Sequence, residues 1–262
     1  MLQRLIPTEI ESSDISHIIE ERTIPNPVVN SVNRTVDEEI IDGTLYVVST
    51  PIGNLSDITY RAVSLLERVA FIAAEDTRHT RKLLSAYDIH TPLLSYTPFN
   101  RRERIPRIIR RLEQGEAAAL VTDAGTPLVS DPGSMLVKAV LDAGLSVTPI
   151  PGASALLAAL VVSGFMTDQF VFEGFLPVKK GRRTRLDALA NEPRTTILYE
   201  SPHRLLKLLG ELQDVIGDRH VIVARELTKK FEEVKRGAVE DIKVWFESHK
   251  PRGEFVVVIG KM

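Results

Sequence analysis

The sequence has 262 residues, 44% of them hydrophobic and 26% charged, which is typical of a globular protein with room for two modest domains. It contains no cysteine, which excludes disulfides and thiolate metal sites, and its six histidines show no metal-ligand spacing. We therefore expect no metal cofactor. No apolar run reaches the roughly 20 residues that span a bilayer, and no secretory signal is present, so we expect a cytoplasmic protein without membrane association.

The net charge of −2 averages two unlike parts. Residues 1–42 carry a net of −6, which leaves a net of +4 for residues 43–262. Residues 1–42 also contain no glycine, phenylalanine, tyrosine or tryptophan, so we expect a poorly ordered acidic arm.

From Gly43 onward, short apolar runs alternate with amphipathic stretches, which predicts an α/β fold. In the first half, strands are expected at 45–48, 69–74, 93–96, 117–121 and 147–150. After Pro151 a helix is expected at 154–162, followed by strands at 170–175, 196–199, 221–224, 232–236 and 254–259. We therefore predict an N-terminal α/β domain with a parallel sheet (43–151), a C-terminal α/β domain with a mixed sheet (152–262) and a cleft between them.

Residues 121–133 are the most densely punctuated segment of the chain, Val-Thr-Asp-Ala-Gly-Thr-Pro-Leu-Val-Ser-Asp-Pro-Gly. They follow an apolar run that suits a buried parallel strand, and ligands of such sheets bind at the carboxyl ends of the strands. Gly125 and Gly133 permit tight turns or close approaches, and Asp131 before Pro132 is expected to cap the next helix. Taken alone, the segment fits a rigid turn and a ligand loop equally well.

Four further loops follow expected strands, at residues 50–55, 75–80, 150–155 and 199–204. In the first of these regions, Ser56 or Asp57 is expected to cap a helix that begins near Thr59. Several such loops around one predicted cleft favour a binding site over simple connections.

These loops, together with residues 224–230 (Ala-Arg-Glu-Leu-Thr-Lys-Lys), resemble the ribosomal RNA small subunit methyltransferase I family of the tetrapyrrole methylase superfamily. The similarity runs in order from Gly43 to about Gly260. It implies a homodimer that binds S-adenosylmethionine, without metal, between two α/β domains. It also implies methylation of the ribose 2′-hydroxyl of a cytidine in the decoding region of 16S rRNA, within the small ribosomal subunit.

Matching the motifs residue by residue assigns cofactor contacts from both domains. The implied cofactor-binding residues are Pro51, Asp123, Gly125, Ser130, Asp131, Ser154, Ala155, Phe175, Leu176 and Pro202. One departure is informative: small-molecule members usually carry a Gly-Gly-Asp-Pro loop, whereas residues 124–127 read Ala-Gly-Thr-Pro, which favours the RNA branch.

A ribose hydroxyl is a poor nucleophile at neutral pH, so a nearby carboxylate or imidazole that accepts its proton would assist transfer. Glu75, Asp76 and His203 are the candidates on the cleft loops. For Glu75 and Asp76, an ion pair with Arg78 or a helix cap is the competing interpretation. For His203 it is a surface position at the start of a helix.

Two groups of basic residues are candidates for RNA binding. The first lies between Arg78 and Arg111, with Tyr96 and Phe99 inside it, and we single out Arg78, Arg101, Arg102 and Arg104. The second runs from Lys179 to Arg185, and we single out Lys179 and Lys180. A solvated helix face is the alternative for Arg107, Arg110 and Arg111.

Two other functions stay open at this point. A tetrapyrrole methyltransferase would use the same fold and cofactor but would not need the two basic groups. A non-catalytic RNA-binding module would need the basic groups but not a cofactor cleft.

Overall fold

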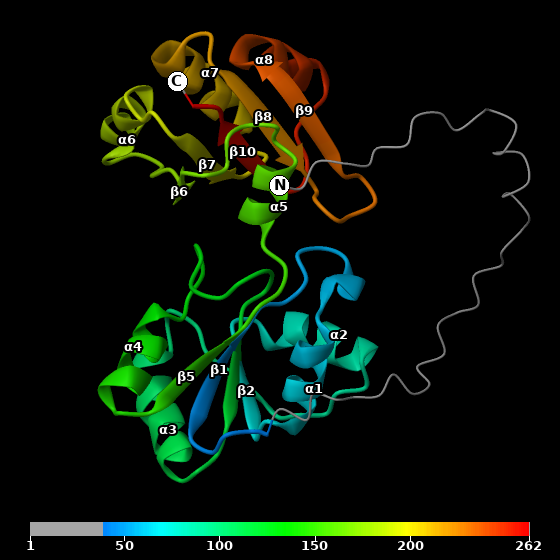
Figure 1. Ribbon diagram of the computed structural model, residues 1–262, viewed down its shortest axis with the longest axis vertical. Helices are drawn as coiled ribbons and strands as arrows, with labels where there is room; N and C mark the ends of the chain where they lie inside the picture. The colour runs from blue at the N-terminus through cyan, green and yellow to red at the C-terminus, as the bar shows by residue number, and fades with distance from the viewer. Residues whose placement is uncertain (1–38, 262) are drawn as a thin grey trace, which may run out of the picture. The chain divides into compact units, whose positions relative to one another are not determined.

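A computed structural model describes residues 39–261 and contains two five-stranded sheets, one from each half of this segment (Figure 1). The predicted arm falls outside the described residues as far as residue 38. Within the described residues, no helix is long and apolar enough to cross a membrane.

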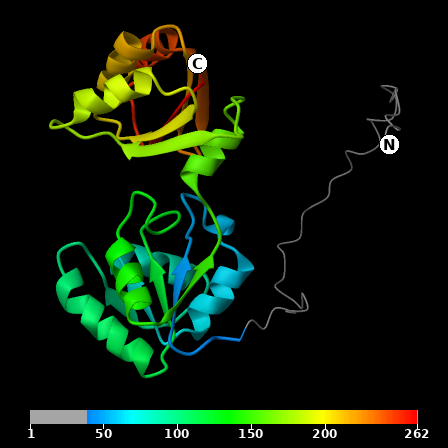
Figure 2. The same ribbon diagram turned by 60° about the vertical axis from the view of Figure 1, so that its left-hand side comes forward.

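The first half forms an all-parallel sheet in the order β3-β2-β4-β1-β5. Its elements are β1 (Thr44–Val48), the 3₁₀ helix η1 (Leu55–Asp57), α1 (Tyr60–Arg68), β2 (Phe71–Ala74), α2 (Thr77–Ala86), β3 (Leu93–Ser95), α3 (Arg101–Glu113), β4 (Ala118–Val121), α4 (Ser134–Asp142) and β5 (Ser146–Ile150). Figure 2 shows these strands pointing in one direction, so the loops after β1, β2, β3 and β4 meet at one edge of the sheet.

Helices cover both faces of this sheet. Leu65 and Leu66 of α1 and Leu84 of α2 pack on one face, whereas Ile108 of α3 and Leu136 of α4 pack on the other (Figure 1). The central strands β2 and β4 are therefore buried along their whole length, which explains their continuous apolar sequences.

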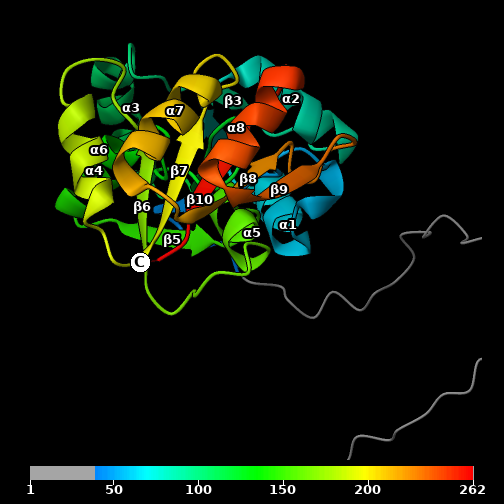
Figure 3. The same cartoon turned by 90° about the horizontal axis from the view of Figure 1, so that it is seen from above.

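The second half forms a mixed sheet in the order β6-β7-β10-β8-β9, in which only β6 and β7 pair in parallel. Its elements are α5 (Ala155–Val161), β6 (Phe170–Phe175), α6 (Arg182–Ala190), β7 (Thr195–Glu200), α7 (Leu205–Ile216), β8 (His220–Arg225), β9 (Glu233–Ala238), α8 (Val239–Ser248) and β10 (Phe255–Ile259). Figure 3 shows α6, α7 and α8 across one face of this sheet, and α5 packs against the other.

The predicted α/β class, with one parallel and one mixed sheet, is confirmed, and all ten expected strands are present. The largest boundary differences, of two residues each, are at β9, which ends at Ala238 rather than at residue 236, and at β2, which begins at Phe71 rather than at residue 69. Val69 instead ends α1, where its N–H donates to the carbonyl of Leu65.

Two predicted helix caps are wrong. Asp131 does not cap α4, because the chain turns again after Pro132 and the helix follows Gly133, whose φ is +138°. Ser56 and Asp57 do not cap α1, because they lie within η1. Thr59 caps α1 instead, by accepting a hydrogen bond from the N–H of Ala62 at 3.1 Å.

Candidate active site

The loop after β4 is pinned to the loop after β1 by a short antiparallel bridge. The N–H of Thr50 donates to the carbonyl of Gly125 at 2.9 Å, and the N–H of Gly125 donates back to the carbonyl of Thr50 at 3.0 Å. Gly125 has a φ of +77°, and a Cβ built on it would lie 3.4 Å from Cγ2 of Ile52. Glycine is therefore favoured here by the backbone conformation, which other residues rarely adopt.

Next to this bridge lies a pocket of about 290 Å³, lined by residues from both halves of the chain. The polar wall, as we call it, contains Gly125, Thr126, Ser130 and Asp131 from the first half and Ser154 just before α5, with the apolar Ile52 and Val129 beside them. The apolar wall contains Phe175, Ala224, Leu227, Phe255 and Val256 from the second half, which also contributes Glu200 and Glu254 to the lining. Such a pocket suits a ligand with one polar and one apolar part.

Tyr199 links the start of α5 to the aromatic residues of β6. Its hydroxyl accepts a hydrogen bond from the N–H of Leu156 in α5 at 3.1 Å, and its ring packs edge-on against Phe172 and Phe175. Burial raises the pKa of Tyr199 to about 12, so its hydroxyl stays protonated at neutral pH. Tyr199 therefore adds a neutral polar group to an otherwise apolar surface.

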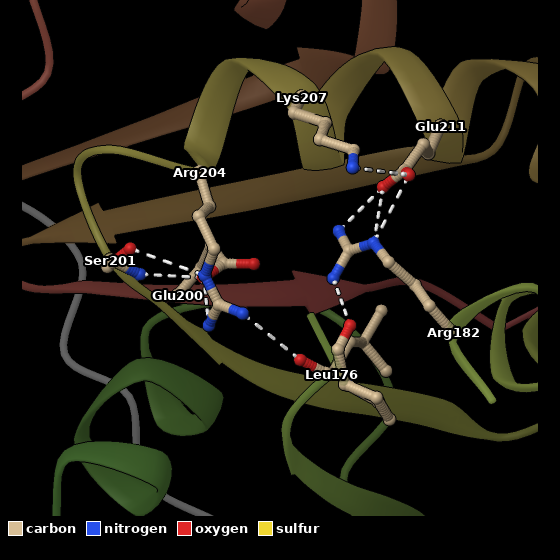
Figure 4. A network of polar contacts seen from close by, with 8 residues as sticks. Leu176, Arg182, Glu200, Ser201, Arg204, Lys207 and Glu211 are labelled. Atoms are coloured by element: carbon tan, nitrogen blue, oxygen red, sulfur yellow. Dashed lines mark hydrogen bonds and ion pairs between the residues drawn. The ribbon is translucent and has the colours of Figure 1, made fainter. Parts of the chain in front are cut away.

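The segment after β7 is held by a buried ion pair (Figure 4). The Glu200 side chain is fully buried, and its Oε1 accepts from Nη2 of Arg204 at 2.6 Å and from the N–H of Ser201 at 2.8 Å. Arg204 also donates from Nη1 to the carbonyl of Leu176 at 3.2 Å. Because Leu176 follows Phe175, this arginine fixes two segments that border the pocket relative to each other.

Four carboxyl groups lie at the same edge of the parallel sheet: Glu75 and Asp76 follow β2, and Asp123 and Asp131 follow β4. Burial, reinforced by Asp123 and Asp131, raises the pKa of Glu75, and burial also raises that of Asp131. Asp76 behaves oppositely, because hydrogen bonds from Arg78 hold its pKa well below the usual range. Glu75 is therefore the stronger proton acceptor of the adjacent pair.

Most of the predicted cofactor-binding residues line the pocket. Those that line it are Gly125, Ser130, Asp131, Ser154, Ala155, Phe175 and Pro202. Pro51 and Leu176 do not line the pocket; each is buried next in sequence to a lining residue, Ile52 and Phe175 respectively. Asp123 does not line the pocket; its Oδ1 accepts from the N–H of Asp76 at 3.2 Å.

The three candidate catalytic residues lie outside the pocket lining. Asp76 caps α2 and pairs with Arg78 at 2.7 Å, as the competing interpretation expected. His203 is an exposed residue just before α7, which also fits its competing interpretation. Glu75 is half-buried and lies close enough to Asp123 and Asp131 for their charges to raise its pKa.

The two basic groups differ in which of their side chains are exposed and which are paired with acids. Arg101 and Arg102 are exposed in the first turn of α3, whereas Arg104 is half-buried and Arg78 pairs with Asp76. In the second group Lys179 and Lys180 are exposed. The three arginines that follow are instead paired with acids: Arg182 with Glu211, Arg183 with Asp187 and Arg185 with Glu173.

Sequence reasoning did not assign Tyr199, Ala224 or Leu227 to the ligand, although they lie in the quoted segments 199–204 and 224–230, and it missed Phe255 and Val256. Phe255 and Val256 lie on β10, and apolar strand residues carry no motif that separates a ligand wall from a protein core. Among residues 39–261, no group of three or more histidine and acidic side chains could hold a metal ion.

The model for the family "Tetrapyrrole (Corrin/Porphyrin) Methylases" matches residues 44–243. Proteins named ribosomal RNA small subunit methyltransferase I are similar to the chain. The Synechocystis sp. protein is 53% identical over 83% of the chain and 78% of its own length. The Thermotoga maritima protein is 48% identical over 83% and 98%, respectively.

Solved structures with the same fold include a cobalt precorrin-4 methyltransferase, with a TM-score of 0.64 and 18% identity, covering 83% of the chain and 95% of that structure. Uroporphyrin-III C-methyltransferase from Thermus thermophilus, solved with S-adenosylhomocysteine, gives a TM-score of 0.59 and 17% identity over 83% and 97%. At these identities the likeness concerns the fold alone.

Proposed function

The chain belongs to the ribosomal RNA small subunit methyltransferase I family of tetrapyrrole methylases, and on that premise we propose that it methylates ribosomal RNA with S-adenosylmethionine as donor. We further propose that the acceptor is the ribose 2′-hydroxyl of a cytidine in the decoding region of 16S rRNA, within the small subunit. The observation that carries the proposal is the pocket at the carboxyl ends of β1 and β4, with its polar and apolar walls.

The chemistry of this pocket fits S-adenosylmethionine. The ligand has an apolar adenine, a positive sulfonium and a charged amino-acid end. Of the charged residues that line the described pocket, all are acidic; Glu200 pairs with Arg204 and Glu254 with Lys229, which leaves the carboxylate of Asp131, with Glu75 and Asp123 nearby. A negative pocket favours the cationic donor over its neutral-sulfur product, because only the donor carries the sulfonium charge.

We assign the polar wall to the amino-acid end of the cofactor. Asp131 and Ser130 offer oxygen acceptors, and the glycine at position 125 permits close approach of a ligand to the backbone. The apolar wall, with Phe175 and Val256, would hold the adenine. Pro51, Asp123 and Leu176 would support these contacts from behind rather than touch the cofactor.

When bound, S-adenosylmethionine supplies an electrophilic methyl group. The task of this chain is to hold the acceptor hydroxyl in line and to remove its proton. We propose Glu75 for proton removal, because its raised pKa makes it a better base than Asp76. Asp76 instead fixes the start of α2.

Four exposed cations are proposed to bind RNA phosphates: Arg101 and Arg102 in the first turn of α3, and Lys179 and Lys180 before α6. Arg78 and Arg104 would play a smaller part, because each has an acidic neighbour. We also propose a cytoplasmic location, where ribosomal subunits are available as substrate.

We propose a homodimer built through α5 and the residues that follow it. Leu157, Val161, Val162 and Met166 expose apolar side chains there, and such a patch is costly to leave in water. Light scattering of the full chain should give twice the chain mass at micromolar concentration. Val161→Asp should shift it toward one chain mass, and a monomeric wild type would refute the dimer.

We propose that residues 43–151 and 152–262 are domains, because separate apolar clusters underlie each sheet. Within residues 43–262, limited proteolysis should cut first near Gly152, which is exposed. First cleavage within β1 or β10 would contradict this division.

Methyl transfer from radiolabelled S-adenosylmethionine tests the function against its two rivals. Purified protein should label small ribosomal subunits that lack their own modification and leave large subunits and uroporphyrinogen unlabelled. Labelling of the tetrapyrrole would favour the small-molecule enzyme. A protein that binds RNA but neither labels it nor binds the cofactor would favour the non-catalytic module.

A further inference from the structure

The loop between β3 and α3 places two aromatic residues in opposite environments. Tyr96 is 2% exposed and packs beneath the sheet with Ile108 and Leu136, so it belongs to the core. Phe99, three residues later, is 97% exposed. A phenylalanine in water contributes no burial to the fold, so its place at this loop tip has no explanation in stability.

The loop holds Phe99 in a fixed position. Oδ1 of Asn100 accepts from the N–H of Thr97 at 2.8 Å, and Oγ1 of Thr97 accepts from the N–H of Phe99 at 3.3 Å. Nδ2 of Asn100 donates back to the carbonyl of Ser95 at 3.2 Å. Pro98 further restricts the backbone. The backbone that carries the Phe99 ring is therefore held in one defined turn by these hydrogen bonds.

The surroundings of Phe99 are positive. Arg101 and Arg102 are exposed in the first turn of α3, immediately after the loop, and the N-terminal end of that helix adds a partial positive charge. A rigid, exposed ring beside guanidinium groups can stack on a nucleic-acid base while the cations neutralise adjacent phosphates. An apolar protein partner would not need the arginines.

The loop also lies on the same sheet edge as the proposed active site. β3 pairs with β2, β2 pairs with β4, and the loops that follow β2 and β4 are joined by the hydrogen bond from Asp76 to Asp123. Phe99 thus follows a strand that is two positions from β4, roughly 10 Å across the sheet.

We propose that Phe99 is a stacking platform for an unpaired base of the RNA substrate, next to the nucleotide whose ribose is methylated. This inference rests on the proposed function and narrows its substrate to RNA that is single-stranded at the target. Arg101 and Arg102 hold the backbone, and Phe99 holds a base.

The test compares variants of the full chain in methylation of small subunits. Phe99→Ala and Phe99→Leu should raise the KM for subunits on the order of tenfold, whereas Phe99→Trp should keep it, because stacking needs a ring rather than an apolar side chain. The matched control is Leu141→Ala, since Leu141 is also exposed but lies at the end of α4, toward the opposite edge of the sheet. All four variants should bind S-adenosylmethionine as the wild type does.

A binding measurement keeps the inference testable if the proposed function fails. Phe99→Ala should weaken binding of an unpaired oligoribonucleotide, but it should not weaken binding of the same oligomer with abasic sugars. In Phe99→Trp, the fluorescence of the added tryptophan should be quenched by the oligomer that carries bases and not by the abasic one. If the wild type labels no RNA yet these differences appear, the function fails and the platform stands. Unchanged KM and unchanged oligomer binding in Phe99→Ala would overturn the platform.

Discussion

The backbone N–H of Asp76 donates a 3.2 Å hydrogen bond to Oδ1 of Asp123, and so joins the loop after β2 to the loop after β4. The first loop carries Glu75, the proposed base, and the second carries the wall of the pocket. The acceptor side and the cofactor side of the proposed reaction are therefore held in a fixed relation by one contact between main chain and side chain.

Glu75→Gln should lower the rate of methyl transfer by about 10²- to 10⁴-fold, the usual contribution of a positioned base, with unchanged affinity for S-adenosylmethionine. Asp76→Asn is the matched control and should be far less affected, because Asn keeps the helix cap. Single-turnover rates and calorimetry measure the two effects. Equal losses in both variants would contradict the assignment of the base to Glu75.

Glu75 also predicts how the rate of methyl transfer depends on pH. Burial raises the pKa of Glu75 above its usual 4.5, and only the ionised form accepts a proton. The wild-type rate should therefore rise with pH through that raised pKa, and Glu75→Gln should lose this limb of the profile. A limb that persists unchanged in the variant would assign it to another group.

Gly125→Ala should weaken cofactor binding, because φ is +77° and an added Cβ would strain the backbone of the pocket wall. The backbone strain alone is about 1–2 kcal/mol. Gly144→Ala is a control of similar strain, since Gly144 has a φ of +74° with no atom within 4 Å of the added Cβ, and it follows α4 away from the pocket. Equal cofactor affinity in the two folded variants would remove Gly125 from the site.

Asp131→Asn should stabilise the free protein while weakening its affinity for S-adenosylmethionine. Burial raises the pKa of Asp131 above 3.8, so the ionised form costs stability, and this cost sets in as the pH rises through 3.8 and is complete above the folded-state pKa. The gain in Tm should be present at pH 7 and should shrink as the pH falls toward 3.8. A gain that does not depend on pH would show that ionisation is not its cause.

Replacing Arg101 and Arg102 together with alanine should raise the KM for small subunits without changing cofactor affinity. Each lost phosphate contact should also make the dependence of log affinity on log salt shallower, by roughly 0.7 for a single strand. Binding measured from 50 to 200 mM salt checks this. An unchanged slope would mean that neither arginine contacts phosphate.

Much of the architecture could be predicted from the alternation of apolar runs, because strands such as β4 are buried on both faces and must be continuously apolar. Local turn geometry was less predictable. Asp131 before Pro132 has the pattern of a helix cap, yet positive φ values at Leu128 and Ser130 turn the chain before α4 begins.

The motif-bearing wall of the pocket could be predicted, whereas its apolar wall could not. Phe255 and Val256 belong to β10, whose sequence is that of any buried strand, and only the packing of the mixed sheet distinguishes them from core residues. Tyr96 and Phe99 likewise look equivalent in sequence, and the turn between them decides that one is buried and the other exposed.

The position of the transferred methyl group tests the central claim most directly. Small subunits labelled by the purified protein would be subjected to alkaline hydrolysis, which cannot cleave after a 2′-O-methylated ribose. The account predicts that the label is recovered in a single alkali-resistant dinucleotide whose methylated residue is cytidine. Label in a base-methylated mononucleotide, or no label in RNA at all, would contradict it.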